Sequence, residues 1–321
     1  NFPDPVMPGT VLQKETLDMM KFLSERRFVL SVNFHSGAEV VNYPWDKWVR
    51  DHADRLWYYS LCRAYADTAH IYSPPGYMDY LDNGVTNGYR WYPVYGSRQD
   101  YVTWELHGRE ITIEVDDDFV TPVYDLQELW DNNRRSLLGF IENGLFGIHG
   151  LVTDVETGNP VPAKILVKGH DKDRSEAYAD TITGSFVRFL SPGTWDLSFS
   201  AVGYRDTIIS DVFVGAYEKT NMAVNMKRII NGIDTAETGW PVLYPNPARG
   251  FVMAELPGSM SGNINIRIFN TAGVKLSDYD DFYTDGIPLQ LNVINLQGGI
   301  YIVRFTRKGT GRTYHGRFIL N

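Results

Sequence analysis

The stretch Ser31-Val-Asn-Phe-His-Ser-Gly-Ala-Glu-Val-Val-Asn-Tyr-Pro-Trp-Asp46 decides how the first part of this chain folds. It begins inside a near-continuous apolar run from Phe28 to Phe34, which predicts a strand buried on both faces, as in a mixed sheet covered by helices. The strand ends at His35, a position where α/β sheets place ligand-binding residues. A lone histidine is more often structural than a metal ligand, so this stretch needs support from others.

The sequence around it indicates an α/β domain over residues 1–144. Helical spacing is present at Glu15–Arg26, Asp51–His70 and Asp125–Asn143, and Gly144 is a candidate helix C-cap. Ile111–Val115 predicts a second short strand.

Two further stretches carry polar residues that an α/β core does not need. Residues 84–101 (GVTNGYRWYPVYGSRQDY) are rich in glycine and aromatics and lack periodicity, which predicts a long, ordered and functional loop. Glu114 interrupts the apolar strand, and burying a carboxylate is costly unless it is paired or used in chemistry. Glu114 is therefore a candidate acid or base, and an edge-strand glutamate that faces water is the alternative.

Composition limits the remaining possibilities. The 321 residues have 43% hydrophobic content, enough for folded cores, and a net charge of -9, which argues against nucleic acid and anionic membranes as partners. No apolar run approaches the roughly 18 residues that a membrane span needs. Cys62 is the single cysteine, so we expect no intrachain disulfide and no thiolate zinc site, and we expect Cys62 to be a small buried hydrophobe.

After the α/β segment the texture changes to short alternating strands and turns. Residues 145–228 contain Thr157-Gly-Asn-Pro160 and Ser191-Pro-Gly193 as chain reversals, which predicts one small β-sandwich. Residues 229–241 lack a sustained period and are interpreted as a linker, and residues 242–321 predict a second all-β unit. The expected fold class is thus multidomain: an α/β mixed-sheet domain followed by two small all-β sandwich domains.

The motifs of residues 1–144, in their order, resemble the M14 zinc carboxypeptidases of the branch that contains carboxypeptidases D, E, M and N. The matching motifs are His-Ser-Gly, Asn-Tyr-Pro-Trp-Asp, Gly-Val-Thr-Asn-Gly, Trp-Tyr, Gln-Asp and Glu-Ile-Thr-Ile-Glu, and Asn1-Phe-Pro-Asp4 resembles the end of a further family motif. The resemblance implies zinc-dependent removal of C-terminal residues from peptides or proteins.

It also implies roles for individual residues. His35 matches the family's third zinc ligand, and Glu114 matches the glutamate that takes a proton from the zinc-bound water and passes it to the leaving amine. Tyr92 matches the mobile tyrosine that closes over the substrate. Asp46 and Gln99 match positions that line the pocket for the terminal side chain, where a carboxylate favours lysine or arginine.

The family's other two zinc ligands, a His-x-x-Glu pair, and its substrate-binding Asn-Arg pair are expected upstream of Asn1. We expect no His-x-x-Glu pair, and therefore no local substitute, within these residues. The chain is therefore expected to be an N-terminally truncated and inactive portion of an enzyme, because a single ligand cannot hold catalytic zinc.

The two β segments resemble modules that suit such an enzyme. Residues 145–228 resemble the transthyretin-like carboxypeptidase-regulatory domain, which follows the catalytic domain in this branch. Residues 242–321, with Leu243-Tyr-Pro-Asn-Pro247 and Leu296-Gln-Gly-Gly-Ile-Tyr-Ile-Val-Arg304, resemble the C-terminal sorting domain of type IX secretion in Bacteroidetes. This implies recognition by that machinery, export through the periplasm, and a secreted or cell-surface protein.

The resulting interpretation is a secreted zinc metallocarboxypeptidase specific for basic C-terminal residues. The alternatives are a non-catalytic, peptide-binding surface protein with a decayed carboxypeptidase fold, and β modules that bind carbohydrate. Retention of His35, Tyr92 and Glu114 favours the enzyme. The other histidines are interpreted as structural, and Lys168–Arg174 is predicted to be a solvated loop.

Overall fold

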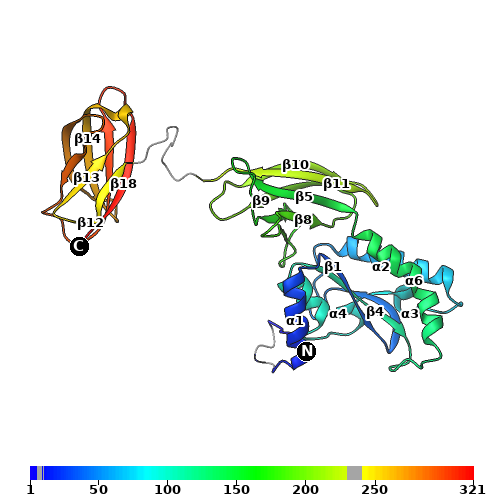
Figure 1. Ribbon diagram of the computed structural model, residues 1–321. Coiled ribbons are helices and arrows are strands. Elements are labelled where there is room, and N and C mark those ends of the chain that lie inside the picture. Colours follow the sequence, from blue (N-terminus) through cyan, green and yellow to red (C-terminus); the bar gives the residue numbers. More distant parts are fainter. Residues whose placement is uncertain (6–8, 10, 230–240) are drawn as a thin grey trace. The chain divides into compact units, whose positions relative to one another are not determined.

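The computed structural model describes residues 1–5, 9, 11–229 and 241–321, which fall into two compact units, Asn1–Ile229 and Ile230–Asn321 (Figure 1). Apart from its two end residues, the linker predicted at 229–241 lies outside the described residues.

The first part of unit one is an α/β domain built on a four-stranded mixed sheet with the order β1-β4-β2-β3. Its strands are β1 (Leu30–His35), β2 (Ala38–Tyr43), β3 (Val85–Asn87) and β4 (Arg109–Asp116). Its helices are α1 (Lys14–Arg26), α2 (Arg55–Tyr72), α3 (Tyr80–Gly84), α4 (Gly88–Trp91), α5 (Arg98–Glu105) and α6 (Leu126–Asn143). β1 runs parallel to β4, and β2 runs antiparallel to it.

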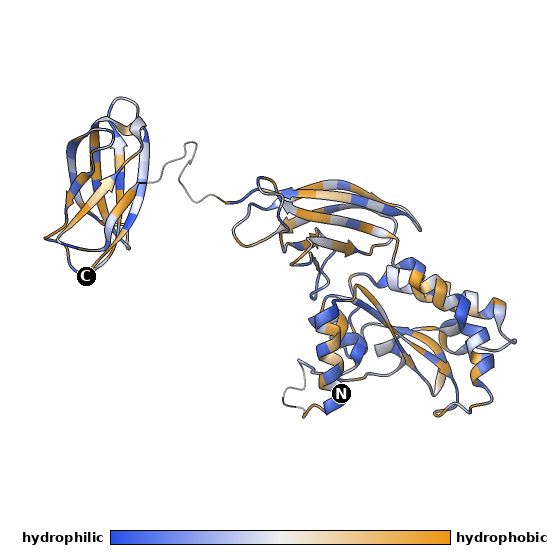
Figure 2. Ribbon diagram, in the orientation of Figure 1, coloured by the Kyte–Doolittle hydropathy of each residue, from blue (hydrophilic) through white to orange (hydrophobic). Residues whose placement is uncertain are grey.

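The two faces of this sheet differ because side chains alternate along each strand. Ile111 and Ile113 of β4 belong to a core that α2 and α6 complete, and Cys62 of α2 is fully buried in it, as predicted. Figure 1 shows α2 and α6 side by side, and Figure 2 shows that both helices carry apolar as well as polar residues. The opposite face carries polar side chains. The prediction that β1 is buried on both faces is wrong, because β1 is the end strand of the described sheet and Phe34 is half exposed.

The stretch predicted as a loop at residues 84–101 contains regular structure instead. It holds β3, α4 and the start of α5. The Asn87 side chain accepts the backbone N–H of Arg90, and the Ser97 hydroxyl accepts that of Asp100. These caps satisfy helix-terminal donors, so short helices form where periodicity is too brief to indicate them.

Residues 147–226, here called the two-sheet region, form two sheets with the orders β10-β9-β6-β7 and β11-β5-β8. The strands are β5 (Gly147–Asp154), β6 (Lys164–Val167), β7 (Ala177–Tyr178), β8 (Ser185–Arg188), β9 (Gly193–Ser200), β10 (Thr207–Val214) and β11 (Lys219–Met226). Both sheets contribute to one apolar cluster that includes Val152, Ile165 and Phe199.

The prediction that Lys168–Arg174 is a solvated loop is wrong in part. The side chains of His170 and Asp171 are only 19% and 1% exposed. His170 contacts Asp54 of the α/β domain, and Asp171 contacts Arg188 of the two-sheet region.

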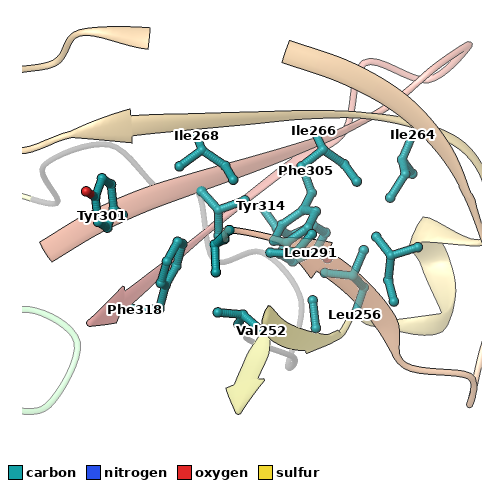
Figure 3. Packing of buried hydrophobic residues seen from close by; sticks show 14 of the residues in the cluster. Val252, Leu256, Ile264, Ile266, Ile268, Leu291, Tyr301, Phe305, Tyr314 and Phe318 are labelled. Carbon is teal, nitrogen blue, oxygen red and sulfur yellow. The ribbon is translucent and has the colours of Figure 1, made fainter. Parts of the chain in front are cut away.

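Unit two is a seven-stranded sheet with the order β15-β14-β17-β18-β12-β13-β16. Its strands are β12 (Val242–Arg249), β13 (Phe251–Glu255), β14 (Gly262–Asn270), β15 (Lys275–Tyr283), β16 (Leu289–Asn292), β17 (Gly299–Arg307) and β18 (Thr313–Leu320). Side chains from opposite strands, among them Val252, Ile266, Leu291 and Phe305, pack into one core (Figure 3). No described helix is long and apolar enough to cross a membrane.

Candidate functional site

His35 and Glu114 meet at the ends of neighbouring parallel strands. The register pairs His35 of β1 with Glu114 of β4, and His35 Nδ1 lies 2.8 Å from Glu114 Oε2. The imidazole is 54% exposed and the carboxylate 7% exposed, so a half-exposed ring stands beside a buried carboxylate. The alternative of an edge-strand glutamate facing water is wrong, because β4 lies between β1 and β2.

Burial raises the pKa of Glu114 above its ordinary value, the hydrogen bond and charge of His35 oppose that rise, and the charge of Asp46 adds to it. A carboxyl group with a raised pKa at the open end of a sheet can exchange protons nearer neutral pH than a solvated glutamate.

Tyr92 lies close enough to both carboxylates to feel their charges. It follows α4 directly and is half exposed. Partial burial raises the pKa of its phenol, and Glu114 and Asp46 raise it further. These three predicted site residues therefore share one electrostatic neighbourhood.

Asp46 and Gln99 lie in a buried polar network on the same side of the sheet. Gln99 Nε2 donates to Asp46 Oδ1 at 2.5 Å and to Asn42 Oδ1 at 3.1 Å, while Thr112 Oγ1 donates to Gln99 Oε1 at 3.1 Å. Burial raises the pKa of Asp46 to about 6, although hydrogen bonds from Ser97, Gln99 and Asn42 lower it in part. The amide of Gln99 is thus fully engaged in orienting its neighbours.

Several residues that sequence reasoning left unassigned hold Asp46 in place. Asp100 accepts the backbone N–H groups of both Asp46 and Lys47 at 3.0 and 3.2 Å, and Lys47 Nζ lies 3.1 Å from Asp4 Oδ2. Burial and the charge of Asp46 raise the pKa of Asp100 to about 8. A Cβ atom at Gly88 would lie 1.8 Å from Asp46 Oδ1, so only glycine allows this approach.

The donor set around His35 fits part of a catalytic zinc site. Such sites use three protein ligands and a water, and a histidine nitrogen beside a carboxylate supplies one ligand and an acid or base. Among the described residues His35 would hold the metal, and its Nδ1 faces Glu114.

Within the described parts of the chain, one group of three potential metal ligands lies close together: Asp54, His170 and Asp171. Arginines already neutralise its carboxylates. Arg109 Nη2 and Arg188 Nη1 lie 2.7 and 2.8 Å from Asp54 Oδ2, and Arg188 Nη2 lies 2.5 Å from Asp171 Oδ1. A dication would have to displace these guanidinium groups, so the cluster does not fit a metal.

The expectation that the chain has no His-x-x-Glu spacing is also wrong, since His107 and Glu110 have it. The structure gives the two side chains different surroundings. His107 Nδ1 forms a hydrogen bond with the carbonyl of Arg174. Glu110 accepts a hydrogen bond from Ser31 Oγ at 2.6 Å and forms an ion pair with Arg98 at 3.1 Å. Both groups have protein partners of their own, so the pair does not fit a zinc site.

Two family models match the sequence. Residues 7–136 match the model described as zinc carboxypeptidase, of the M14 peptidases, and residues 242–321 match the model described as secretion system C-terminal sorting domain.

Three curated proteins illustrate the similarity. Carboxypeptidase SOL1 of Arabidopsis thaliana is 32% identical over 223 residues, covering 64% of this chain and 43% of that protein. The human carboxypeptidase N catalytic chain is 33% identical over 234 residues, covering 68% and 50%. Human carboxypeptidase D is 30% identical over 275 residues, covering 78% and 20%. The aligned region thus spans half or less of each of these proteins.

Proposed function

We propose that the protein is an exported metallocarboxypeptidase, because it carries an M14 zinc carboxypeptidase domain at residues 7–136 and a secretion-system C-terminal sorting domain at residues 242–321. It removes C-terminal residues, with a preference for lysine and arginine. The observation that carries the proposal is the contact of His35 with the buried Glu114 at the open end of the sheet.

Glu114 is the proton carrier of the proposed reaction. A zinc ion held in part by His35 would polarise the scissile carbonyl and acidify a water molecule. Glu114 takes the proton of that water and gives it to the leaving amine, for which its raised pKa suits it. Tyr92, exposed and near both carboxylates, is the group that covers the substrate.

Asp46 sets the preference for a basic side chain. A lysine or arginine that enters the site finds a buried carboxylate already oriented by Gln99 Nε2 at 2.5 Å. A charge-assisted hydrogen bond in such surroundings is stronger than one in water. The sorting domain directs the protein to export by the type IX machinery, so the enzyme acts at the cell surface or in the medium.

The test is hydrolysis of peptides ending in lysine, arginine or leucine by the protein as its own gene encodes it, loaded with zinc. Glu114→Gln should lower kcat by about 10²- to 10⁴-fold, because the proton carrier is lost, and zinc content should stay the same. Glu142→Gln, an exposed change on α6, is the matched control and should leave kcat unchanged.

Asp46→Asn should reduce the preference for lysine over leucine while hydrolysis of the leucine peptide continues. If the encoded protein binds these peptides but cleaves none of them in the presence of zinc, the peptide-binding alternative replaces the enzyme. Equal rates for the lysine and leucine peptides would contradict the proposed specificity alone.

A further inference from the structure

The two-sheet region reaches into the α/β domain through Asp54. Asp54 is fully buried in the α/β domain, and Arg109 Nε of the same domain donates to it at 2.8 Å. The two-sheet region supplies the other partners: Arg188 Nη1 and Nη2 at 2.8 and 2.9 Å, and His170 Nε2 at 2.7 Å. Burial alone would raise the pKa of Asp54, but Arg188 and Arg109 hold it well below its ordinary value.

A second group of contacts joins the same two parts nearer the surface. The loop after β6, residues 169–175, carries Asp173, which lies 3.0 Å from Arg50 Nε. The same loop carries Arg174, which lies 3.4 Å from Glu105 and places its guanidinium 5.8 Å from the ring centre of Trp104. The loop therefore holds the α/β domain at several points.

Two of these contacts are made by residues of the short segment 46–54, Arg50 and Asp54. Trp45 is fully buried, and its ring packs against Trp48 and His52, each with ring centres 4.8 Å apart. Trp48 in turn packs on Trp104 at 4.4 Å. Trp48 and His52 thus join Trp45 and Trp104 in one aromatic cluster between Asp46 and Asp54, while Val49 and Arg50 are exposed, and the two-sheet region contacts the far end of the segment at Asp54. Interiors packed this tightly transmit displacement from one contact to the next.

We propose that the loop at residues 169–175 is a positioning element for Asp46, so that the two-sheet region holds the specificity pocket of the α/β domain in shape. The proposal rests on the proposed function in one respect, that Asp46 contacts the substrate's terminal side chain. The mechanical link itself is independent of catalysis.

The test is amide hydrogen exchange on the full chain, read from peptides that cover residues 44–54. The variant is His170→Ala combined with Arg174→Ala, which leaves Arg109 and Arg188 to neutralise Asp54. We expect the amides of Asp46 and Lys47 to exchange about tenfold faster than in wild type, as the loss of one charge-assisted hydrogen bond would give in a local opening equilibrium. Exchange in α6 and β15 should not change.

Lys172→Ala is the matched control, because its exposed side chain lies in the same loop, and exchange should match wild type. The proposal is overturned if residues 44–54 exchange at the wild-type rate in the double variant while peptides of residues 169–175 exchange faster. Arg188→Met is a stronger form of the test, and if that variant does not fold, the double variant decides.

Kinetics separate this inference from the proposed function. If the enzyme is active, the double variant should raise KM for lysine peptides and leave kcat for leucine peptides unchanged. If neither the wild-type protein nor the variants cleave any peptide, the proposed function fails. Hydrogen exchange then still tests whether the loop positions Asp46.

Discussion

His52 is a buried histidine whose surroundings favour the neutral ring over the protonated one. It is 1% exposed, its ring lies against Trp45 and Tyr58, and its Nδ1 accepts the backbone N–H of Asp54 at 2.9 Å. Burial lowers the pKa of His52 to about 3, although Asp54 works in the opposite direction. Since Nδ1 must stay an acceptor, the neutral ring is the folded form.

This predicts a loss of stability in mild acid. An unfolded histidine titrates near 6.5, so the contribution of His52 is fully present above pH 6.5 and is lost as pH falls from there toward 3. Between pH 7 and 4.5 the free energy of unfolding of unit one should fall by about 2 kcal/mol more in wild type than in His52→Gln.

Denaturant titrations at the two pH values measure the difference. Ile71→Ala, an exposed and uncharged change on α2, should keep the wild-type pH dependence. Parallel pH dependences for wild type and His52→Gln would contradict a neutral buried His52.

At this scale, the sequence points to the candidate site residues themselves and not to the residues that support them. The resemblance assigns His35, Glu114 and Asp46, and the structure brings them into one neighbourhood. It does not indicate Asp100 or Lys47 as supports, because their partners lie 54 and 43 residues away and no local spacing marks such contacts.

At the scale of elements, Asn133 joins α6 to α2 and to the sheet. Its Oδ1 accepts Tyr65 Oη at 3.0 Å and its Nδ2 donates to Tyr77 Oη at 2.5 Å. Tyr77 Oη in turn donates to the carbonyl of Val115 on β4 at 3.0 Å. Asn133 is 7% exposed, so any of these groups left unpaired would be cut off from water.

Asn133→Leu should therefore destabilise unit one by about 1–3 kcal/mol, the usual cost of buried polar groups without partners. Chemical denaturation with a far-UV signal measures this. Leu138→Ala, on the exposed side of the same helix, should cost less than about 0.5 kcal/mol. Equal costs for the two changes would show that the tyrosines find other partners.

Helices whose apolar periodicity extends over several turns are predictable here. Short helices that depend on one side-chain cap are not. The three predicted helices correspond to α1, α2 and α6, with α2 starting at Arg55 instead of Asp51. The short elements between residues 84 and 101 depend on two side-chain caps and on contacts with distant strands, so a pattern search reads the stretch as a loop.

At the scale of the whole molecule, the two units have separate cores and different charge. Residues 242–321 contain eight lysines and arginines against five aspartates and glutamates, whereas the entire chain has a net charge of -9. The core of unit two includes Phe305, Ile266 and Phe318, all fully buried and all from its own strands (Figure 3). All members of that core in the described part of the chain come from unit two itself, so the two units should unfold separately.

Phe305→Ala tests this independence. Removing a fully buried phenylalanine should cost about 3–5 kcal/mol, because the ring's transfer energy is lost and a cavity remains. Calorimetry of the full chain should show one transition shifted to lower temperature and the transition of unit one unchanged, while Ile294→Ala, an exposed change in the same unit, should shift neither. A single transition that moves as a whole would mean that the units unfold together, and the sorting domain would then be a structural part of the enzyme instead of a separable address.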